Sequence, residues 1–161
     1  IPSPSSATET DYANKVEKAI ALINQKLAGK LQLSASNSAP ATGNYIQISY
    51  GTSFVPNGST NYAGYCANVS TAPNLGNMIS PSSSNAIATQ PVYINLGNGH
   101  CDVTQDIVTH EFGHALGLPG HFAGFGDGPA ISGAYWDVLA TLYGNPVSTK
   151  AADLQIVRAA P

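Results

Sequence analysis

The residues in this sequence whose types and spacing could do chemistry lie in the run His110-Glu111-Phe112-Gly113-His114. Side chains four residues apart share one face of an α-helix, so both imidazoles can point at a single metal ion. Neutral imidazole nitrogen suits zinc, at a distance of about 2.0–2.1 Å. Glu111 lies one position round the helix, where its carboxylate can take a proton from a metal-activated water and pass it to a leaving amine. The pattern therefore predicts a hydrolytic zinc site with Glu111 as the general base.

A catalytic zinc ion usually has three protein ligands and a water molecule, so one more protein ligand is expected. Glu111 is the last glutamate in the chain, which excludes a glutamate on a later helix. The remaining downstream side chains that can bind zinc are His121, Asp127, Asp137 and Asp153. We favour His121, because imidazole suits zinc and a nearby histidine orders less chain than Asp137 would. Asp137 and Asp127 stay open as alternatives.

Three other residues near the motif each have two interpretations. Asp106 lies one turn before His110 and could accept a proton from a ligand imidazole, or could be a carboxylate favoured by the positive end of the helix. Tyr135 could stabilise an oxyanion or pack in the core. His100 precedes the predicted helix, and a structural or exposed role is expected for it.

The helix that must position this motif is predicted over residues 103–116. Asp102 is a candidate N-cap, Gln105 three residues later completes a capping-box pattern, and Gly117 suits a left-handed C-cap. Pro119-Gly120 can then bend the chain back towards the metal.

Helices and strands are predicted on both sides of the motif. Residues 10–28 form a helix ended by Gly29, because apolar residues recur at helical spacing: Tyr12, Val16, Ala19, Ile20, Ile23 and Leu27. Residues 30–36, 45–50 and 92–96 read as strands, and the stretch 51–89 should hide one or two more. Ser132 caps a helix with Tyr135, Val138, Leu139 and Leu142 on one face, and a last short helix covers 149–159. This order predicts one α+β domain over residues 1–161, with an extended arm at 1–9 and a C-terminal extension at 145–161.

The composition indicates an extracellular setting. Charged residues make up 9% of the 161 residues, against about 25% in typical soluble domains. The net charge is −3 and the basic residues are scattered, so neither nucleic acid nor a membrane is an expected partner. Cys66 and Cys101 can form one disulfide or remain two buried thiols. The low charge, and a start without Met or a signal peptide, favour a mature secreted protein.

The string from His110 to His121 resembles the metzincins, a family of zinc peptidases. Gly117 occupies the place of the family glycine at which the chain turns towards the third ligand, and the family pattern would place that ligand at Gly120. His121 follows one residue later. The snapalysin-like group is similar too, although Gly120 and Phe122 stand where that group has Asp and Tyr.

The resemblance covers roughly residues 10–144 and is specific over 110–121. Ile131-Ser132-Gly133 looks like the Met-Ser-Gly turn of the snapalysin-like group with Ile in place of Met, and residues 137–144 are similar to the closing helix of matrixins. The resemblance implies a metzincin-like fold. It allows calcium as a further ion, although no Asp-rich loop of EF-hand type occurs.

These observations predict a secreted, monomeric zinc endopeptidase that acts on proteins or peptides. One zinc ion would be bound by His110, His114 and His121, and Glu111 would be the general base. Three alternatives stay open: an aspartate-ligand peptidase using Asp137, a catalytically silent binding module that keeps zinc, and a zinc amidase acting on a non-peptide substrate.

Overall fold

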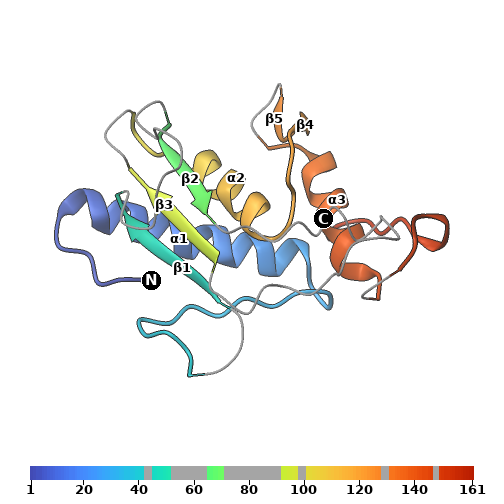
Figure 1. Cartoon of the computed structure of the whole chain (residues 1–161), viewed down its shortest axis with the longest axis horizontal. Coiled ribbons are helices and arrows are strands. Elements are labelled where there is room, and N and C mark those ends of the chain that lie inside the picture. The colour runs from blue at the N-terminus through green and yellow to red at the C-terminus, as the bar shows by residue number, and fades with distance from the viewer. Residues whose placement is uncertain (42–44, 52–64, 71–91, 98–100, 128–130, 147–148) are drawn as a thin grey trace.

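The computed structural model describes residues 1–41, 45–51, 65–70, 92–97, 101–127, 131–146 and 149–161 (Figure 1). Three α-helices and two small sheets occur within these ranges. In chain order the elements are α1 (Ala7–Lys26), β1 (Ile46–Tyr50), β2 (Ala67–Ser70), β3 (Val92–Leu96), α2 (Gln105–Ala115), β4 (Phe122–Ala123), β5 (Gly126–Asp127), α3 (Gly133–Gly144) and a 3-10 turn at Ala151–Asp153. The predicted mixture of helices and strands is confirmed, as three helices and a small mixed sheet.

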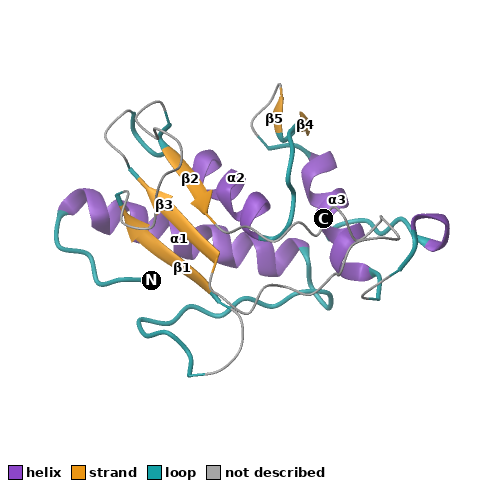
Figure 2. Cartoon of the chain, in the orientation of Figure 1, coloured by secondary structure: helices purple, strands orange, loops and turns teal. Residues whose placement is uncertain are grey.

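The larger sheet has β3 at its centre. β1 pairs with β3 in parallel, from Ile46 opposite Val92 to Tyr50 opposite Leu96, and β2 pairs with the other edge of β3 in the antiparallel sense (Figure 2). Strand β3 has the predicted bounds of 92–96, and β1 begins one residue later than the predicted strand over 45–50. Strand β2 lies in the stretch 51–89, where one or two further strands were expected.

Helix α1 begins earlier than its apolar pattern indicated. Ser6 is the N-cap, because its hydroxyl accepts a hydrogen bond from the Glu9 amide at 3.1 Å. The Glu9 carboxylate accepts hydrogen bonds from the amide and the hydroxyl of Ser5 in return. The helix therefore starts at Ala7, and the prediction of an arm over residues 1–9 was too long because only the polar cap marks this start.

The prediction of a strand over residues 30–36 was wrong. Lys30 lies in a turn and residues 31–36 form no helix or strand, so the segment belongs to neither described sheet. The amide of Leu33 donates to Asn24 Oδ1 at 2.7 Å, and its carbonyl accepts from Asn24 Nδ2 at 2.9 Å. The alternating pattern is explained by Leu31 and Leu33, which pack against the core. A side chain of α1 thus takes the place of a neighbouring strand.

The core lies between α1, α2 and the larger sheet. Helix α2 contacts α1, β2 and β3, and its buried residues Val108 and Phe112 join those of the strands. Lys15 Nζ donates to the Val103 carbonyl at 2.7 Å, and Gln105 Nε2 donates to the Lys15 carbonyl at 3.0 Å. These two bonds join the middle of α1 to the start of α2. None of the helices in the described ranges is long and apolar enough to cross a membrane.

Helix α3 begins where Ser132 was predicted to cap it, and the hydroxyl of this serine accepts from the Ala134 amide at 3.2 Å. Its buried face differs from the prediction in one respect. Val138 is 41% exposed, while the buried positions are Tyr135, Trp136, Leu139, Ala140 and Leu142.

The predicted helix over residues 149–159 is wrong as well, since only the 3-10 turn at Ala151–Asp153 forms there. The backbone of the rest of this segment forms hydrogen bonds with residues in or next to α1 and α3 instead of helical hydrogen bonds within the segment. The Asn145 side chain pairs with the backbone of Gln155 at 2.8 and 2.9 Å, and the Ala160 amide donates to the Lys26 carbonyl at 3.0 Å. The C-terminal extension is therefore a strap across α3 and the end of α1.

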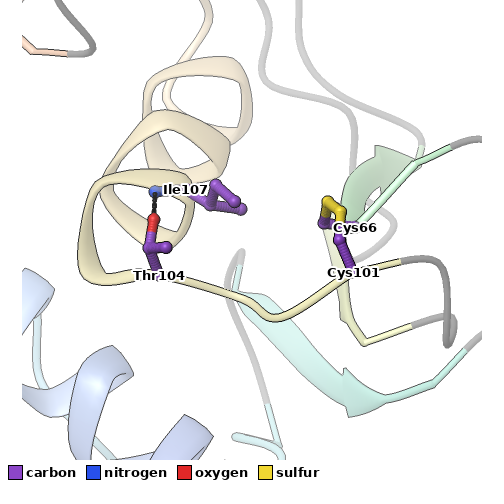
Figure 3. Close-up of a disulfide and its surroundings, with 4 residues drawn as sticks. All are labelled: Cys66, Cys101, Thr104 and Ile107. Carbon is purple, nitrogen blue, oxygen red and sulfur yellow. Dashed lines mark hydrogen bonds between the residues drawn. A yellow bond between two sulfur atoms is a disulfide. The ribbon is translucent and has the colours of Figure 1, made fainter.

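A disulfide joins Cys66 to Cys101, with their Cα atoms 5.0 Å apart (Figure 3). Cys66 directly precedes β2, and Cys101 lies three residues before Thr104, the N-cap of α2. Of the two possibilities that the sequence leaves open for these cysteines, the structure shows the disulfide. The bond fastens the start of the helix that carries the histidines to the edge strand of the sheet.

Purified protein is expected to show no free thiol when it is denatured without a reductant. A crosslink across 35 residues stabilises by about 4 kcal/mol in the chain-entropy model, so reduction should also lower the urea midpoint clearly. Thiol titration with a chromogenic disulfide reagent is the measurement. Two titratable thiols in the non-reduced protein would contradict the bridge.

Candidate metal centre

Helix α2 carries His110 and His114 on one face. Its N-cap is Thr104, whose hydroxyl accepts from the Ile107 amide at 3.3 Å (Figure 3). The predicted cap at Asp102 was two residues too early, because Gln105 does not complete a capping box but bonds to the Lys15 carbonyl.

The end of α2 follows the prediction at Gly117. This glycine has φ of 110°, its amide donates to the His114 carbonyl, and the Leu118 amide donates to the Gly113 carbonyl, both at 3.0 Å. The two bonds form a Schellman motif. Tyr143 of α3 also donates its hydroxyl to the Leu116 carbonyl at 2.7 Å. The chain consequently leaves the helix along a fixed path towards His121.

Three imidazoles converge after this turn. The Nε2 atoms of His110 and His114 are 3.0 Å apart, and His121 Nε2 lies 3.2 Å from the first and 3.3 Å from the second. Two ligands of a tetrahedral zinc ion, each about 2.0–2.1 Å from it, lie roughly 3.3–3.4 Å apart. The triangle is only slightly smaller than this spacing. The group formed by His110, His114 and His121 can therefore hold a metal ion.

A hydrogen bond to the backbone orients the His114 ring. Its Nδ1 lies 2.7 Å from the Leu118 carbonyl oxygen, which can only accept, so Nδ1 carries the proton. In the neutral ring Nε2 is then unprotonated, and its lone pair faces the other two histidines. Outer contacts of this type fix the ring and increase its basicity as a ligand. The turn at Gly117 brings the Leu118 carbonyl to His114, and so it also selects the His114 tautomer that is protonated on Nδ1.

Burial keeps the two helix histidines neutral. The pKa of His110 is lowered to about 4 by burial and by the neighbouring charges of His114 and His121. Burial also lowers the pKa of His114, although the hydrogen bond to Leu118 opposes this effect. A metal ion binds the unprotonated ring. At neutral pH no proton has to leave His110 before an ion can bind.

Glu111 is the one buried acidic residue among the described residues, at 7% exposure. Burial raises its pKa to about 7. A carboxyl with this pKa is about half ionised at neutral pH, so it can both accept and release a proton. Glu111 does not belong to the metal-capable group. Glu111 follows His110 directly in α2, so a carboxyl that can exchange a proton near neutral pH lies next in sequence to a residue of that group.

His121 comes from the loop between α2 and β4, and it is the exposed member of the group. Gly126 makes its position possible. A Cβ at Gly126 would lie 2.5 Å from the His121 ring, and its φ of +79° also favours glycine. The pairing of β4 with β5 sets this approach, with Phe122 opposite Gly126. His121 therefore reaches the other histidines although it stands one residue later than the metzincin pattern requires.

The structure places Asp137 outside the group. Its carboxylate accepts from the Ala159 amide at 3.0 Å and pairs with Arg158 at 2.5 Å. These two bonds hold its pKa below the usual range, the backbone bond contributing most. Asp137 thus anchors the C-terminal strap. Asp127 and Asp153 lie in β5 and the 3-10 turn, also outside the metal-capable group.

The other residues singled out from the sequence take structural positions where they are described. Tyr135 is fully buried and donates its hydroxyl to the Thr109 carbonyl at 2.7 Å. Burial and the charge of Glu111 raise its pKa, so it stays neutral in the core. Asp106 is exposed near the N-terminus of α2, which favours its interpretation as a helix carboxylate. His100 lies outside the described residues.

One residue of the site was missed. Phe125 is fully buried and its ring contacts those of His110, His114 and His121. The sequence offers a weak signal for it, a single aromatic residue between Gly124 and Gly126 in a glycine-rich loop.

Comparison of the chain with protein-family models, with curated proteins and with solved structures found no match.

Proposed function

We propose that this protein is a zinc-dependent endopeptidase with a metzincin-like fold, in which His110, His114 and His121 bind the zinc ion. One observation carries the proposal. Three Nε2 atoms converge within 3.0–3.3 Å of one another, next in sequence to the buried carboxyl of Glu111. A site that held zinc only for structure would be closed by four protein ligands and would gain nothing from Glu111.

Each part of the site has a task in this proposal. When bound, zinc supplies Lewis acidity that activates a water and polarises the scissile carbonyl. Glu111 accepts the proton of the attacking water and returns it to the leaving amine. Burial raises the pKa of Glu111 above the usual range of a glutamate, which favours its return of the proton to the leaving amine. The carbonyl of Leu118 keeps the proton of His114 on Nδ1.

The distribution of basic residues argues against a carboxypeptidase. Residues 31–149, which include the whole proposed site, contain no Lys or Arg. Recognition of the free carboxylate at the end of a substrate typically uses a cation, most often Arg. An endopeptidase needs no such group.

Secretion belongs to the same proposal. The disulfide between Cys66 and Cys101 is typical of proteins from oxidising compartments. The substrate would be a protein or peptide, cleaved by a monomeric enzyme.

Protein purified without chelators is expected to contain about one zinc ion per chain, because three converging imidazoles favour this metal. Plasma emission spectroscopy gives the content, and casein hydrolysis gives the activity of the same sample. A metal content near zero, with no uptake after zinc is added, would end the metalloenzyme proposal. Bound zinc without hydrolysis of casein or of a peptide library would favour the silent binding module.

A further inference from the structure

Phe125 packs against every histidine of the proposed metal centre. Its ring centroid lies 4.5 Å from that of His110, 4.9 Å from that of His114 and 5.6 Å from that of His121. Among the rings of the described residues, it is the only one outside the group that contacts all three. We propose that Phe125 is a positioning residue, which fixes the orientations of the three imidazoles and so preorganises them for the metal ion.

The Phe125 ring is itself held in place from the other side. It is fully buried and packs on the rings of Tyr135 at 5.2 Å and Phe122 at 5.3 Å. Its amide donates to the Phe122 carbonyl at 2.7 Å, and its carbonyl accepts from the Phe122 amide at 2.9 Å. Tyr135 is fixed by its hydrogen bond to the Thr109 carbonyl. The ring therefore cannot turn away from the histidines without opening the core.

Helix α2 makes room for this ring at Gly113, between the two helix histidines. A Cβ there would lie 2.6 Å from the Tyr135 ring and 2.9 Å from the Phe125 ring. Glycine within a helix is less favourable than alanine in intrinsic propensity. The helix thus has a poor helix former at the position that lets Phe125 reach both histidines.

The histidines differ in how much they depend on Phe125. His114 is also held by its bond to the Leu118 carbonyl, whereas His121 is exposed and comes from a loop. The His121 ring stands at 90° to the Phe125 ring, edge against face. Without this contact, binding of the metal would have to order the imidazole as well, which weakens binding. The inference rests on the proposed function only in that a metal ion binds the group.

The test compares Phe125→Leu with Ile23→Ala, a truncation of a fully buried core residue of α1 that lies outside the histidine group. Zinc affinity is measured by competition with a chelating dye, and the cobalt(II) forms by visible absorption. Phe125→Leu is expected to weaken zinc binding on the order of 10- to 100-fold, as outer contacts of metal ligands typically do, and to change the cobalt absorption bands. Ile23→Ala should lower stability but leave both measurements near wild type.

Urea unfolding of the metal-free proteins separates positioning from a role in the core alone. Phe125→Leu with wild-type zinc affinity and cobalt spectrum, and only reduced stability, would overturn the proposal. If that variant does not fold, Phe125→Met, with a similar side-chain volume, takes its place. Failure of both variants to fold would show that the ring serves the core, and would overturn the proposal too. A wild-type protein that binds neither metal would overturn the proposed function itself.

Discussion

Glu111→Gln is expected to lose peptide hydrolysis by a factor on the order of 10²–10⁴, the usual contribution of a general acid–base group, and to keep its zinc. Gln has the shape of Glu but cannot take a proton from water. The zinc should remain because Glu111 does not belong to the histidine group. Hydrolysis of casein and metal content, measured on one preparation, test the two halves of this expectation.

Asp106→Asn is the matched control for this variant. Asp106 is a carboxylate on the same helix, but it is exposed and outside the metal-capable group, so its change should leave hydrolysis near wild type. Glu111→Gln with wild-type turnover would show that Glu111 is not the general base. A Glu111→Gln variant that lost its zinc would instead make Glu111 part of the metal site.

His121→Ala is expected to weaken zinc binding by orders of magnitude and to abolish hydrolysis. Only the two histidines of α2 would remain, and a catalytic zinc ion generally needs three protein ligands. His121 is exposed, so its removal should affect the folded state little. Zinc affinity from dye competition, together with circular dichroism, separates loss of metal from loss of fold.

Asp137→Ala is the matched control, which should lose stability and keep its zinc, whereas His121→Ala should lose its zinc and keep its fold. It removes the bonds to Ala159 and Arg158, and should lower the melting temperature while zinc stays bound. If His121→Ala kept its zinc and Asp137→Ala lost it, the protein would be an aspartate-ligand peptidase.

The sequence predicted the metal-capable group better than the fold. His110 and His114 follow from helical spacing. His121 follows from the preference of zinc for imidazole and from the short connection after Gly117, which Pro119-Gly120 can bend. Phe125 could not be found in this way, since its role depends on the approach of β4 and β5 to α2. Packing of a single aromatic residue on three side chains leaves no periodic pattern in a sequence.

The three errors in the predicted secondary structure have a common cause. The start of α1, the segment 30–36 and the C-terminal strap are all decided by polar side chains that bond to backbone groups, those of Ser6, Asn24, Asp137 and Asn145. Hydrophobic periodicity indicates which residues are buried, as at Leu31 and Leu33. It does not indicate which groups form hydrogen bonds with the backbone N–H and C=O of those residues. Where a side chain replaces a strand or a helical turn, periodicity alone predicts the wrong element.

The C-terminal strap also has a consequence for the order in which contacts form while the chain is synthesised. The Lys26 carbonyl, at the end of α1, accepts its bond from the Ala160 amide, and Lys26 Nζ donates to the Ala160 carbonyl at 3.2 Å. Chain synthesis proceeds from the N-terminus at about 5–20 residues per second. The last turn of α1 can therefore form these two bonds only after residue 160 has been synthesised, 134 residues after Lys26, so this helix end is fixed late in folding.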